Sequence, residues 1–362
     1  MLPLEPLTKT RRRLALAAVL AAGLALAGGL DQPRAQETTR TAAQTAAQTA
    51  ALQPSFGGFV PPKGWLPPPI DPTGVQLETR ELAPGVYALL SNKPPVDNSG
   101  FVVGARGVLV IDAHINGDMA RQIQAAVRRV TDKPILYLVN TNAHGDHTFG
   151  NYAFPAETTV VAHRRTAEAM RHFEEEKANL LPTVGGNPEI FGDVELRLPD
   201  VTFEETLRLD LGGRVVELHH FGSGNTPGDT VVYVPEARVA WTGNLILGEA
   251  TIPWAIEGDA RAYLETLAAM AARLDIETVV PGHVLTTSGE TLGTYLHYLG
   301  GLIDDVQDAR RRGLSLDETL AALPLDEAYL PPAESPLAAA RPVFQGFHLW
   351  NVKKTYQELS RE

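Results

Sequence analysis

The chain has 362 residues, of which 44% are hydrophobic and 20% are charged, and its formal net charge is −12. The excess of negative charge argues against nucleic-acid binding, because the field of the protein repels phosphates. The absence of cysteine excludes disulfides, cysteine-ligated zinc and thiol nucleophiles.

The N-terminus has the features of an export signal. A basic region, Lys9 and Arg11–Arg13, precedes an apolar run of 17 residues, Leu14–Leu30. The adjacent arginines resemble a twin-arginine signal. Cleavage after Ala35 removes five basic and two acidic residues, so the net charge changes from −12 to −15. We therefore expect a periplasmic or secreted protein with no membrane attachment after cleavage of residues 1–35. The alternative is an uncleaved membrane anchor, for which the apolar run of 17 residues is short.

Residues 36–74 are expected to form a low-complexity and proline-rich tether. The repeat at 41–52, TAAQTAAQTAAL, has no large apolar face, and the prolines that follow favour polyproline II. Trp65 is a candidate to attach this segment to the surface of the domain. We expect the folded domain to occupy residues 75–362, with a helical C-terminal part.

The first half of the folded region predicts strands and helices in alternation. Short β-rich runs bounded by turn residues predict strands, and apolar residues at helical spacing predict helices. The expected elements are, in chain order, strands within 79–90 and 98–113, a helix over 116–132, strands within 133–142 and 158–163, and a helix over 164–181.

The second half repeats this organisation. Gly-Gly and Pro-Glu-Ala turns divide its β-rich segments into hairpins. The expected elements are four strands within 202–222 and 229–247, a helix over 259–275, a strand within 276–283, and a mostly helical remainder from 288. Two strand-rich sections, each followed by helices, predict an α/β (α+β) fold with helices outside two sheets, a four-layer αβ/βα sandwich.

Potential metal ligands are concentrated in the segment NTNAHGDHTFGN, residues 140–151. His144, Asp146 and His147 directly follow a predicted strand, on a loop where side chains can converge. Imidazole and carboxylate groups are the donors from which zinc sites are built. Asn142 occupies the position where a third histidine would complete the pattern H-x-H-x-D-H. A turn-capping role for these residues is the alternative interpretation.

Three further loops follow predicted strands and complete a larger pattern: GSGNTPGDT at 222–230, WTGNLIL at 241–247 and VVPGHV at 279–284. Together with HGDHTFGN and with Asp112 in VLVIDAH, they resemble, in order and approximate spacing, the five motifs of the metallo-β-lactamase superfamily. The resemblance covers about residues 78–300. It implies the metallo-β-lactamase fold and a metal-dependent hydrolase from the broad group of metallo-hydrolases rather than an antibiotic-resistance enzyme.

The resemblance implies two metal positions that this chain fills unequally. Three histidines hold the first metal in the family, and the matching residues here are Asn142, His144 and Asn225. One aspartate and two histidines hold the second metal, and they match Asp146, His147 and His283. A carboxylate that bridges both metals in many members matches Asn244.

The asparagines predict that one metal position is lost. An amide offers zinc only a weak carbonyl oxygen in place of imidazole or carboxylate. We therefore expect one Zn²⁺ at Asp146, His147 and His283, with His144 as a further candidate ligand. A second ion, or another divalent metal, is the alternative.

The catalytic residues are expected to be His144, Asp146, Asn142 and Asn225. His144, beside a metal-activated water, is a candidate general base, and the alternative is a vestigial side chain bonded to Asn142 or Asn225. The amides of Asn142 and Asn225 could donate to a developing oxyanion. Asn244 is expected to orient water or a ligand, and Asp112 resembles the aspartate that supports the motif loop in the family.

The leading functional hypothesis is an exported zinc hydrolase that cleaves an acyl C–O or C–N bond of a small molecule, such as a lactone, ester, thioester or lactam. A non-catalytic binding or scaffold protein that kept the fold is the rival hypothesis, motivated by the three asparagines. An iron or manganese protein with redox chemistry is a third. No pattern identifies the substrate or the oligomeric state.

Overall fold

The computed structural model describes residues 58–335 and 337–361, which all belong to one compact unit. The predicted export signal at 1–35 and the repeat at 41–52 lie outside the described residues. No helix within the described part of the chain has both the length and the apolar character that crossing a bilayer requires.

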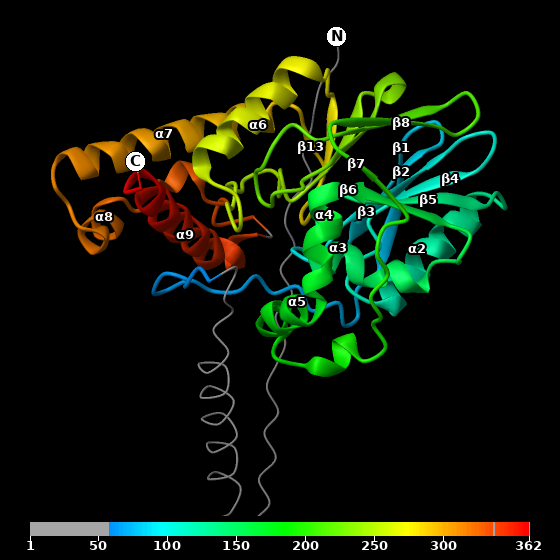
Figure 1. Cartoon of the computed structure of the whole chain (residues 1–362), viewed down its shortest axis with the longest axis horizontal. Helices are drawn as coiled ribbons and strands as arrows, with labels where there is room; N and C mark the ends of the chain where they lie inside the picture. The colour runs from blue at the N-terminus through cyan, green and yellow to red at the C-terminus, as the bar shows by residue number, and fades with distance from the viewer. Residues whose placement is uncertain (1–57, 336, 362) are drawn as a thin grey trace, which may run out of the picture. The chain divides into compact units, whose positions relative to one another are not determined.

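The first sheet contains seven strands whose order across the sheet is their order in the chain (Figure 1). They are β1 (Leu77–Ala83), β2 (Val86–Ser91), β3 (Ser99–Val103), β4 (Val108–Ile111), β5 (Ile135–Asn140), β6 (Thr159–His163) and β7 (Val201–Phe203). β1 to β4 pair antiparallel, and β4 to β7 pair parallel. Because β3 runs against β4 and β5, its first residue lies at the edge where β4 and β5 end.

The second sheet contains six strands in the spatial order β13-β12-β11-β10-β9-β8. They are β8 (Thr206–Asp210), β9 (Val215–His219), β10 (Val231–Val234), β11 (Val239–Gly243), β12 (Thr278–Pro281) and β13 (Thr287–Ser288). Gly212 and Gly213 turn the β8–β9 hairpin with φ of 89° and 82°, a conformation that favours glycine. Both hairpins predicted from the turn residues are present.

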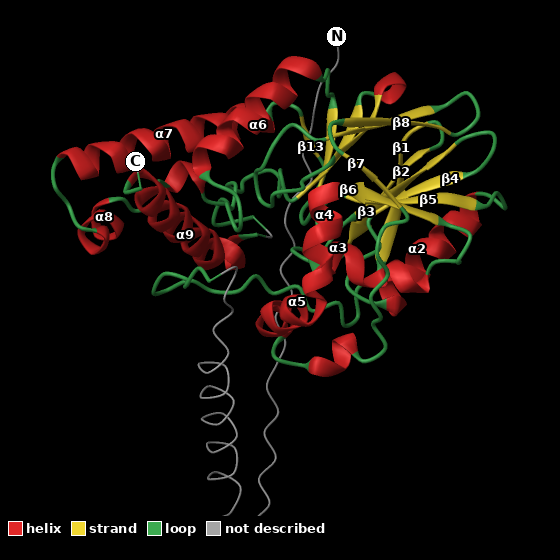
Figure 2. Ribbon diagram, viewed as in Figure 1, coloured by secondary structure: helices red, strands yellow, loops and turns green. Residues whose placement is uncertain are grey.

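Helices cover the outer faces of the two sheets (Figure 2). They are α2 (Gly117–Val130), α3 (Gly145–Thr148), α4 (Arg164–Ala169), α5 (Phe173–Leu180), α6 (Ala260–Arg273), α7 (Thr291–Arg311), α8 (Leu316–Ala322) and α9 (Arg341–Leu359). One apolar cluster joins α2 to the first sheet, and another joins α6, α7 and α9 to the second. The predicted four-layer sandwich is confirmed.

The two sheets pack face to face through a third apolar cluster. Strand residues of both sheets contribute, among them Leu109, Val139, Val232 and Trp241, and all are nearly or fully buried. A Cβ atom at Gly100 would collide with the indole of Trp241. Glycine at this position therefore allows the sheets to approach closely at the end that carries the site.

The packed structure begins before residue 75, where the sequence predicts the start of the folded domain. Ile70 is buried in the cluster of the first sheet. Phe59 and Trp65 pack on Trp350 of α9, with ring centroids 4.4 and 5.7 Å apart. The expected attachment through Trp65 is present, and residues 58–74 belong to the domain rather than to the tether.

The single helix predicted over 164–181 is interrupted. α4 is followed by a 3₁₀ turn, Met170–His172, before α5 begins. The change of direction brings Glu176 of α5 to the start of α3, where its Oε1 accepts a hydrogen bond of 3.0 Å from Gly145 N. Tertiary contacts with α3 therefore override the local helical pattern.

Candidate metal centre

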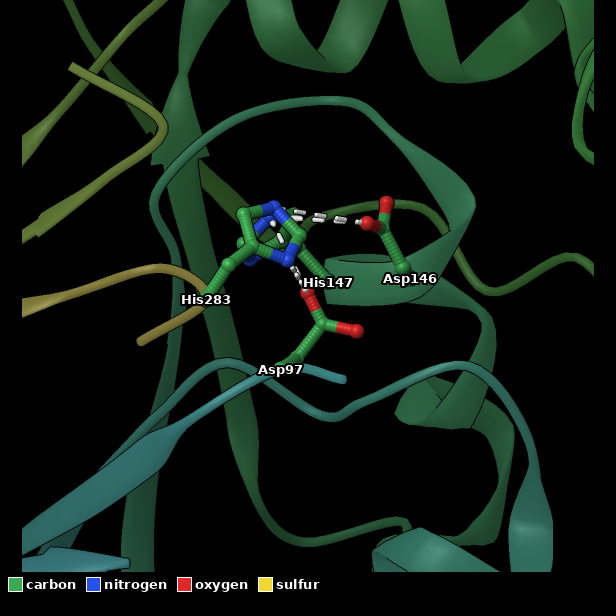
Figure 3. Close-up of side chains that lie close together, drawn as sticks. All are labelled: Asp97, Asp146, His147 and His283. Carbon is green, nitrogen blue, oxygen red and sulfur yellow. Dashed lines mark ion pairs between the residues drawn. The ribbon is translucent and has the colours of Figure 1, made fainter. Parts of the chain in front are cut away.

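Four side chains that can hold a metal ion converge where strand ends of the two sheets meet (Figure 3). Asp97 lies two residues before β3, Asp146 and His147 lie in α3, which follows a short loop after β5, and His283 lies two residues after β12. One donor atom of each lies within 4.8 Å of those of the others. The fold therefore places next to one another residues that are far apart in the sequence.

The separations between these donor atoms are close to those in a coordination shell. Asp97 Oδ1 lies 3.2 Å from His283 Nδ1 and 3.7 Å from His147 Nε2. Asp146 Oδ2 lies 3.8 Å from His283 Nε2 and 4.0 Å from His147 Nε2. Donors that each lie about 2.1 Å from one tetrahedral ion are roughly 3.4 Å apart. His283 offers one ring nitrogen to an ion, and with one donor atom from each residue the four start within 4.8 Å of one another. A contraction of the cluster would bring these groups onto a common ion.

Buried oxygens without hydrogen-bond partners support a cation at this position. Both carboxylate oxygens of Asp97 and Oδ1 of Asp146 are buried and have no partner among the described residues. Buried carboxylates are unfavourable unless a positive charge or hydrogen bonds compensate them. Two carboxylates and two imidazoles are also suitable donors for zinc or a similar divalent ion. The residues present therefore fit a metal ion.

Hydrogen bonds outside the cluster orient both imidazoles. His147 Nδ1 lies 2.9 Å from Asp112 Oδ2, and Thr141 donates to the same carboxylate from its N and Oγ1, each at 2.7 Å. His283 Nδ1 lies 2.9 Å from Pro95 O. His147 Nε2 is left to face the cluster, as in metal sites where a second group fixes the imidazole. The His283 ring lies between the two carboxylates, with Nε2 towards Asp146 and Nδ1 towards Asp97. Asp112 thus contacts a ring of the cluster without belonging to the cluster.

The charges in the cluster affect its proton affinity. Burial raises the pKa of Asp97, and the neighbouring Asp146 raises it further. For His147, burial opposes protonation, but Asp112 and Asp146 outweigh it and raise the pKa to about 9. Burial lowers the pKa of His283 to about 4. A metal ion at this site would therefore have to displace a proton from His147.

His144 lies beside the cluster rather than within it. Its Nδ1 contacts Asn244 Nδ2 at 3.2 Å, and its buried Nε2 has no hydrogen-bond partner and lies 3.8 Å from Glu257 Oε1. Burial disfavours the charged ring, but Glu257 and Glu176 outweigh it and raise the pKa of His144 to about 9. In the metal-free protein the neighbouring carboxylates thus favour the protonated ring of His144, the opposite of the state that a general base needs.

The three asparagines are buried, and two of them, Asn142 and Asn244, contact His144. Asn142 Oδ1 accepts from His144 N at 2.9 Å and leaves its Nδ2 without a partner. Asn225 Nδ2 donates to Trp254 O at 2.6 Å, so the atom it leaves unpaired is the acceptor Oδ1, not the donor expected from the sequence. Asn244 Oδ1 lies 3.0 Å from His147 Nε2 and thus connects His147 with His144.

Sequence reasoning missed three acidic residues at the site. Asp97 belongs to the cluster, and Glu176 and Glu257 surround His144. None lies in a recognisable ligand motif. The signal available for Asp97 is an acidic residue two positions before a strand that is buried along most of its length. That signal is weak without knowledge of which strand ends meet.

A family model described as the metallo-beta-lactamase superfamily matches residues 93–283, more than half of the chain. The chain belongs to the metallo-beta-lactamase superfamily. A linear primary-alkylsulfatase from Pseudomonas sp. (strain ATCC 19151) is 25% identical over 178 residues, 41% of this chain and 33% of the relative. The match thus spans only about a third of that relative's length.

Solved structures show the same fold at low sequence identity. The metallo-beta-lactamase from Pontibacter korlensis aligns with a TM-score of 0.50 and 20% identity, over 62% of this chain and 99% of that one. The stereoselective inverting sec-alkylsulfatase Pisa1 from Pseudomonas sp. aligns with a TM-score of 0.57 and 17% identity, over 78% of this chain and 50% of that one.

One cavity reaches the metal centre of this superfamily member, and a second reaches His144 beside it. One has a volume of about 70 Å³, and Asp146, His144 and His283 lie at its polar end. Its apolar walls include Ile70, Leu247, Trp254, Val343, Phe344 and Phe347. The other is a wide groove of about 1030 Å³ that shares His144 with the first and is bordered by Glu257 and Lys354. His144 therefore lines both the apolar pocket and the groove.

Proposed function

We propose that this protein is a metal-dependent hydrolase that cleaves an acyl C–O or C–N bond of a small molecule with an apolar portion. The observation that carries the proposal is the buried cluster of two aspartates and two histidines at the end of an apolar pocket. Membership of the superfamily supports hydrolysis, because its members are usually hydrolases. We further propose zinc as the metal.

The cluster residues would hold the metal, and His144 would handle protons. When bound, a zinc ion supplies an acidified water and polarises an acyl oxygen. Because Asn244 occupies Nδ1, His144 exchanges protons at Nε2, next to Glu257. The unpaired Nδ2 of Asn142 is a donor available to developing negative charge.

The apolar pocket would bind the part of the substrate that does not react. Phe344 and Phe347 of α9 contribute to its wall, and Ile70 contributes from the N-terminal segment. Each methylene that moves from water into such a pocket stabilises the complex by roughly 0.8 kcal/mol. We therefore expect esters or lactones with an aliphatic chain to be better substrates than short ones.

A second candidate is hydrolysis of an alkyl sulfate. It is supported by the 25% identity to a linear primary-alkylsulfatase and by the apolar pocket. A sulfate ester keeps its negative charge when bound, and Asp97, Asp146 and Glu257 already place carboxylates around the site. The acyl substrate is neutral and avoids this repulsion, which is why we place it first.

Matched substrates test the proposal. Protein loaded with one equivalent of zinc is assayed with p-nitrophenyl octanoate, p-nitrophenyl acetate and octyl sulfate, before and after chelation. We expect chelator-sensitive hydrolysis of the octanoate at a higher kcat/KM than that of the acetate. Turnover of octyl sulfate alone would instead establish the second candidate, and metal-loaded protein inert towards all three would favour a binding or scaffold role.

We also propose that the protein acts after export, in the periplasm or outside the cell, on a small-molecule substrate and without nucleic acid. The basic and apolar N-terminus and the net charge of −12 support this. Cell fractionation of a C-terminally tagged full-length chain tests it: recovery of uncleaved protein in the cytosol would contradict export.

A further inference from the structure

We propose that Asp97 is a ligand of the metal ion, so that two carboxylates and two imidazoles hold a single ion in a site that has lost its second metal position. The inference rests on the proposed function in that it requires the metal centre, but it concerns a residue outside the ligand motifs. Its support is the position of Asp97, the lack of partners for its carboxylate, and the charge of the cluster.

The backbone around Asp97 is fixed by contacts that do not involve a metal. Asp97 O accepts a hydrogen bond of 2.9 Å from His114 Nε2. The next residue, Asn98, donates from its N to Gly282 O at 2.7 Å and from its Nδ2 to Pro281 O and Val284 O at 3.0 and 2.6 Å. Asn98 thus attaches the Asp97 segment of the first sheet to the loop of the second sheet that carries His283.

The carboxylate of Asp97 points into the cluster (Figure 3). The side chain is 1% exposed, and neither oxygen has a hydrogen-bond partner. The nitrogens near it belong to His283 and His147, at 3.2 and 3.7 Å. The closer of these, His283 Nδ1, is also only 2.9 Å from Pro95 O, which competes for its hydrogen. A structural ion pair therefore does not account for Asp97.

A divalent ion balances the charge that the cluster otherwise lacks. Asp97 and Asp146 are both buried and converge on the same histidines, an arrangement in which like charges repel. With two neutral imidazoles, two carboxylates neutralise one divalent ion. A site with two aspartates and two histidines also binds oxygen-preferring ions better than a site with one aspartate and two histidines. Asp97→Asn should accordingly weaken Mn²⁺ binding more than Zn²⁺ binding.

Metal affinity of Asp97→Asn is the test, with Glu176→Gln as the matched control. Glu176 is a carboxylate that borders the same pocket but lies outside the cluster. Competition with a chromophoric chelator measures zinc affinity in both variants and in the wild type. We expect the zinc affinity of Asp97→Asn to fall by more than about 100-fold, beyond the 10–100-fold loss typical of groups that only orient ligands. The zinc affinity of Glu176→Gln should fall by less than about tenfold.

Thermal unfolding of the metal-free proteins separates a ligand from a structural residue. Asp97→Asn replaces a buried carboxyl group that lacks hydrogen-bond partners with a neutral amide of nearly the same shape. Its Tm without metal should therefore be equal to or above that of the wild type, while its gain in Tm on adding zinc should shrink. The alternative is that Asp97 and Asp146 share a proton, which predicts a lower metal-free Tm and an unchanged zinc affinity for Asp97→Asn. That pair of results would overturn the inference.

A crystal structure of the zinc-loaded wild type gives a result that does not depend on folding of the variant. An Asp97 oxygen 2.0–2.2 Å from the ion is expected for a ligand, and a distance beyond 3 Å would overturn the inference even if Asp97→Asn fails to fold. The outcomes also separate the two proposals. Wild-type protein that binds no metal refutes the proposed function, whereas equal affinity in wild type and Asp97→Asn refutes only the role of Asp97.

Discussion

His147 and Asp112 form a buried pair in which Nδ1 of the ring lies 2.9 Å from Oδ2 of the carboxylate. Thr141 holds the same carboxylate with two hydrogen bonds of 2.7 Å. The pair connects the end of β4 to α3 and leaves His147 Nε2 facing the cluster. The orientation of one ligand of the proposed centre therefore depends on a residue that does not itself face the metal position.

Asp112→Asn should lower zinc affinity by about 10–100-fold while the fold is retained, because the neutral amide orients His147 less firmly and makes it a weaker donor. Chelator competition measures the affinity, and circular dichroism checks the fold. Asp118→Asn, an exposed change on α2, is the control. An affinity equal to that of the wild type would mean that the packing of His147 alone holds the ring.

Zinc binding should release a proton and strengthen as pH rises. The pKa of His147 in the metal-free protein is raised from 6.5 to about 9, whereas binding needs an unprotonated Nε2. Apparent affinity should therefore rise up to about tenfold per pH unit between pH 6.5 and 9 and then level off. Calorimetry in buffers of different ionisation enthalpy counts the protons, and a pH-independent affinity would contradict a protonated His147.

The same shift predicts the pH dependence of metal-free stability. Because the folded-state pKa of His147 is raised, protonation stabilises the folded protein fully below pH 6.5, and this contribution disappears as pH rises through about 9. Replacing His147 with Gln should remove this component from a plot of the free energy of unfolding against pH. If the difference in free energy of unfolding between the wild type and the variant stays constant from pH 6 to 9, His147 does not have the raised pKa.

His283→Ala and His144→Ala should behave differently. His283 belongs to the cluster, so its loss should abolish metal binding and hydrolysis. His144→Ala should keep one metal equivalent and lower kcat by about 10²–10⁴-fold, the usual contribution of a group that transfers protons. Metal analysis and steady-state kinetics measure both effects. Loss of metal from His144→Ala would make His144 a ligand.

The triple variant Asn142→His, Asn225→His and Asn244→Asp should take up a second zinc ion. With His144 it would restore the three histidines and the bridging carboxylate that the family resemblance implies. Binding of the second ion should weaken at low pH as the imidazoles protonate. Adding His144→Ala to the triple variant is the control and should remove the second ion. A folded triple variant with one ion would show that these loops no longer have the ligand geometry.

The pocket should set the preference for chain length. Val343→Trp fills space beside the metal centre, so kcat/KM for p-nitrophenyl octanoate should fall more than about tenfold, with a much smaller effect on the acetate. Gln345→Trp adds the same side chain at an exposed position of α9 and is the control. An equal fall in kcat/KM for both esters would mean that the aliphatic chain of the octanoate binds outside this pocket.

Local sequence patterns were sufficient to predict most of the fold and the motif residues of the site. Strand and helix periodicity and the Gly212–Gly213 turn act over a few neighbouring residues, so two sheets with outer helices could be predicted. Asp146 and His147 are adjacent, and His283 directly follows a strand in a family motif. Their proximity could be predicted from the resemblance, and their role as ligands stays a prediction.

Contacts between distant segments decided the rest. Asp97 reaches the cluster because β3 runs antiparallel to β4 and because Asn98 bonds to the loop after β12, more than 180 residues away. Phe59 is ordered by Trp350 of α9, and Glu176 reaches Gly145 only through the break before α5. Each depends on burial and hydrogen bonding that exist only once the sheets and helices have packed, so no local pattern in the sequence records them.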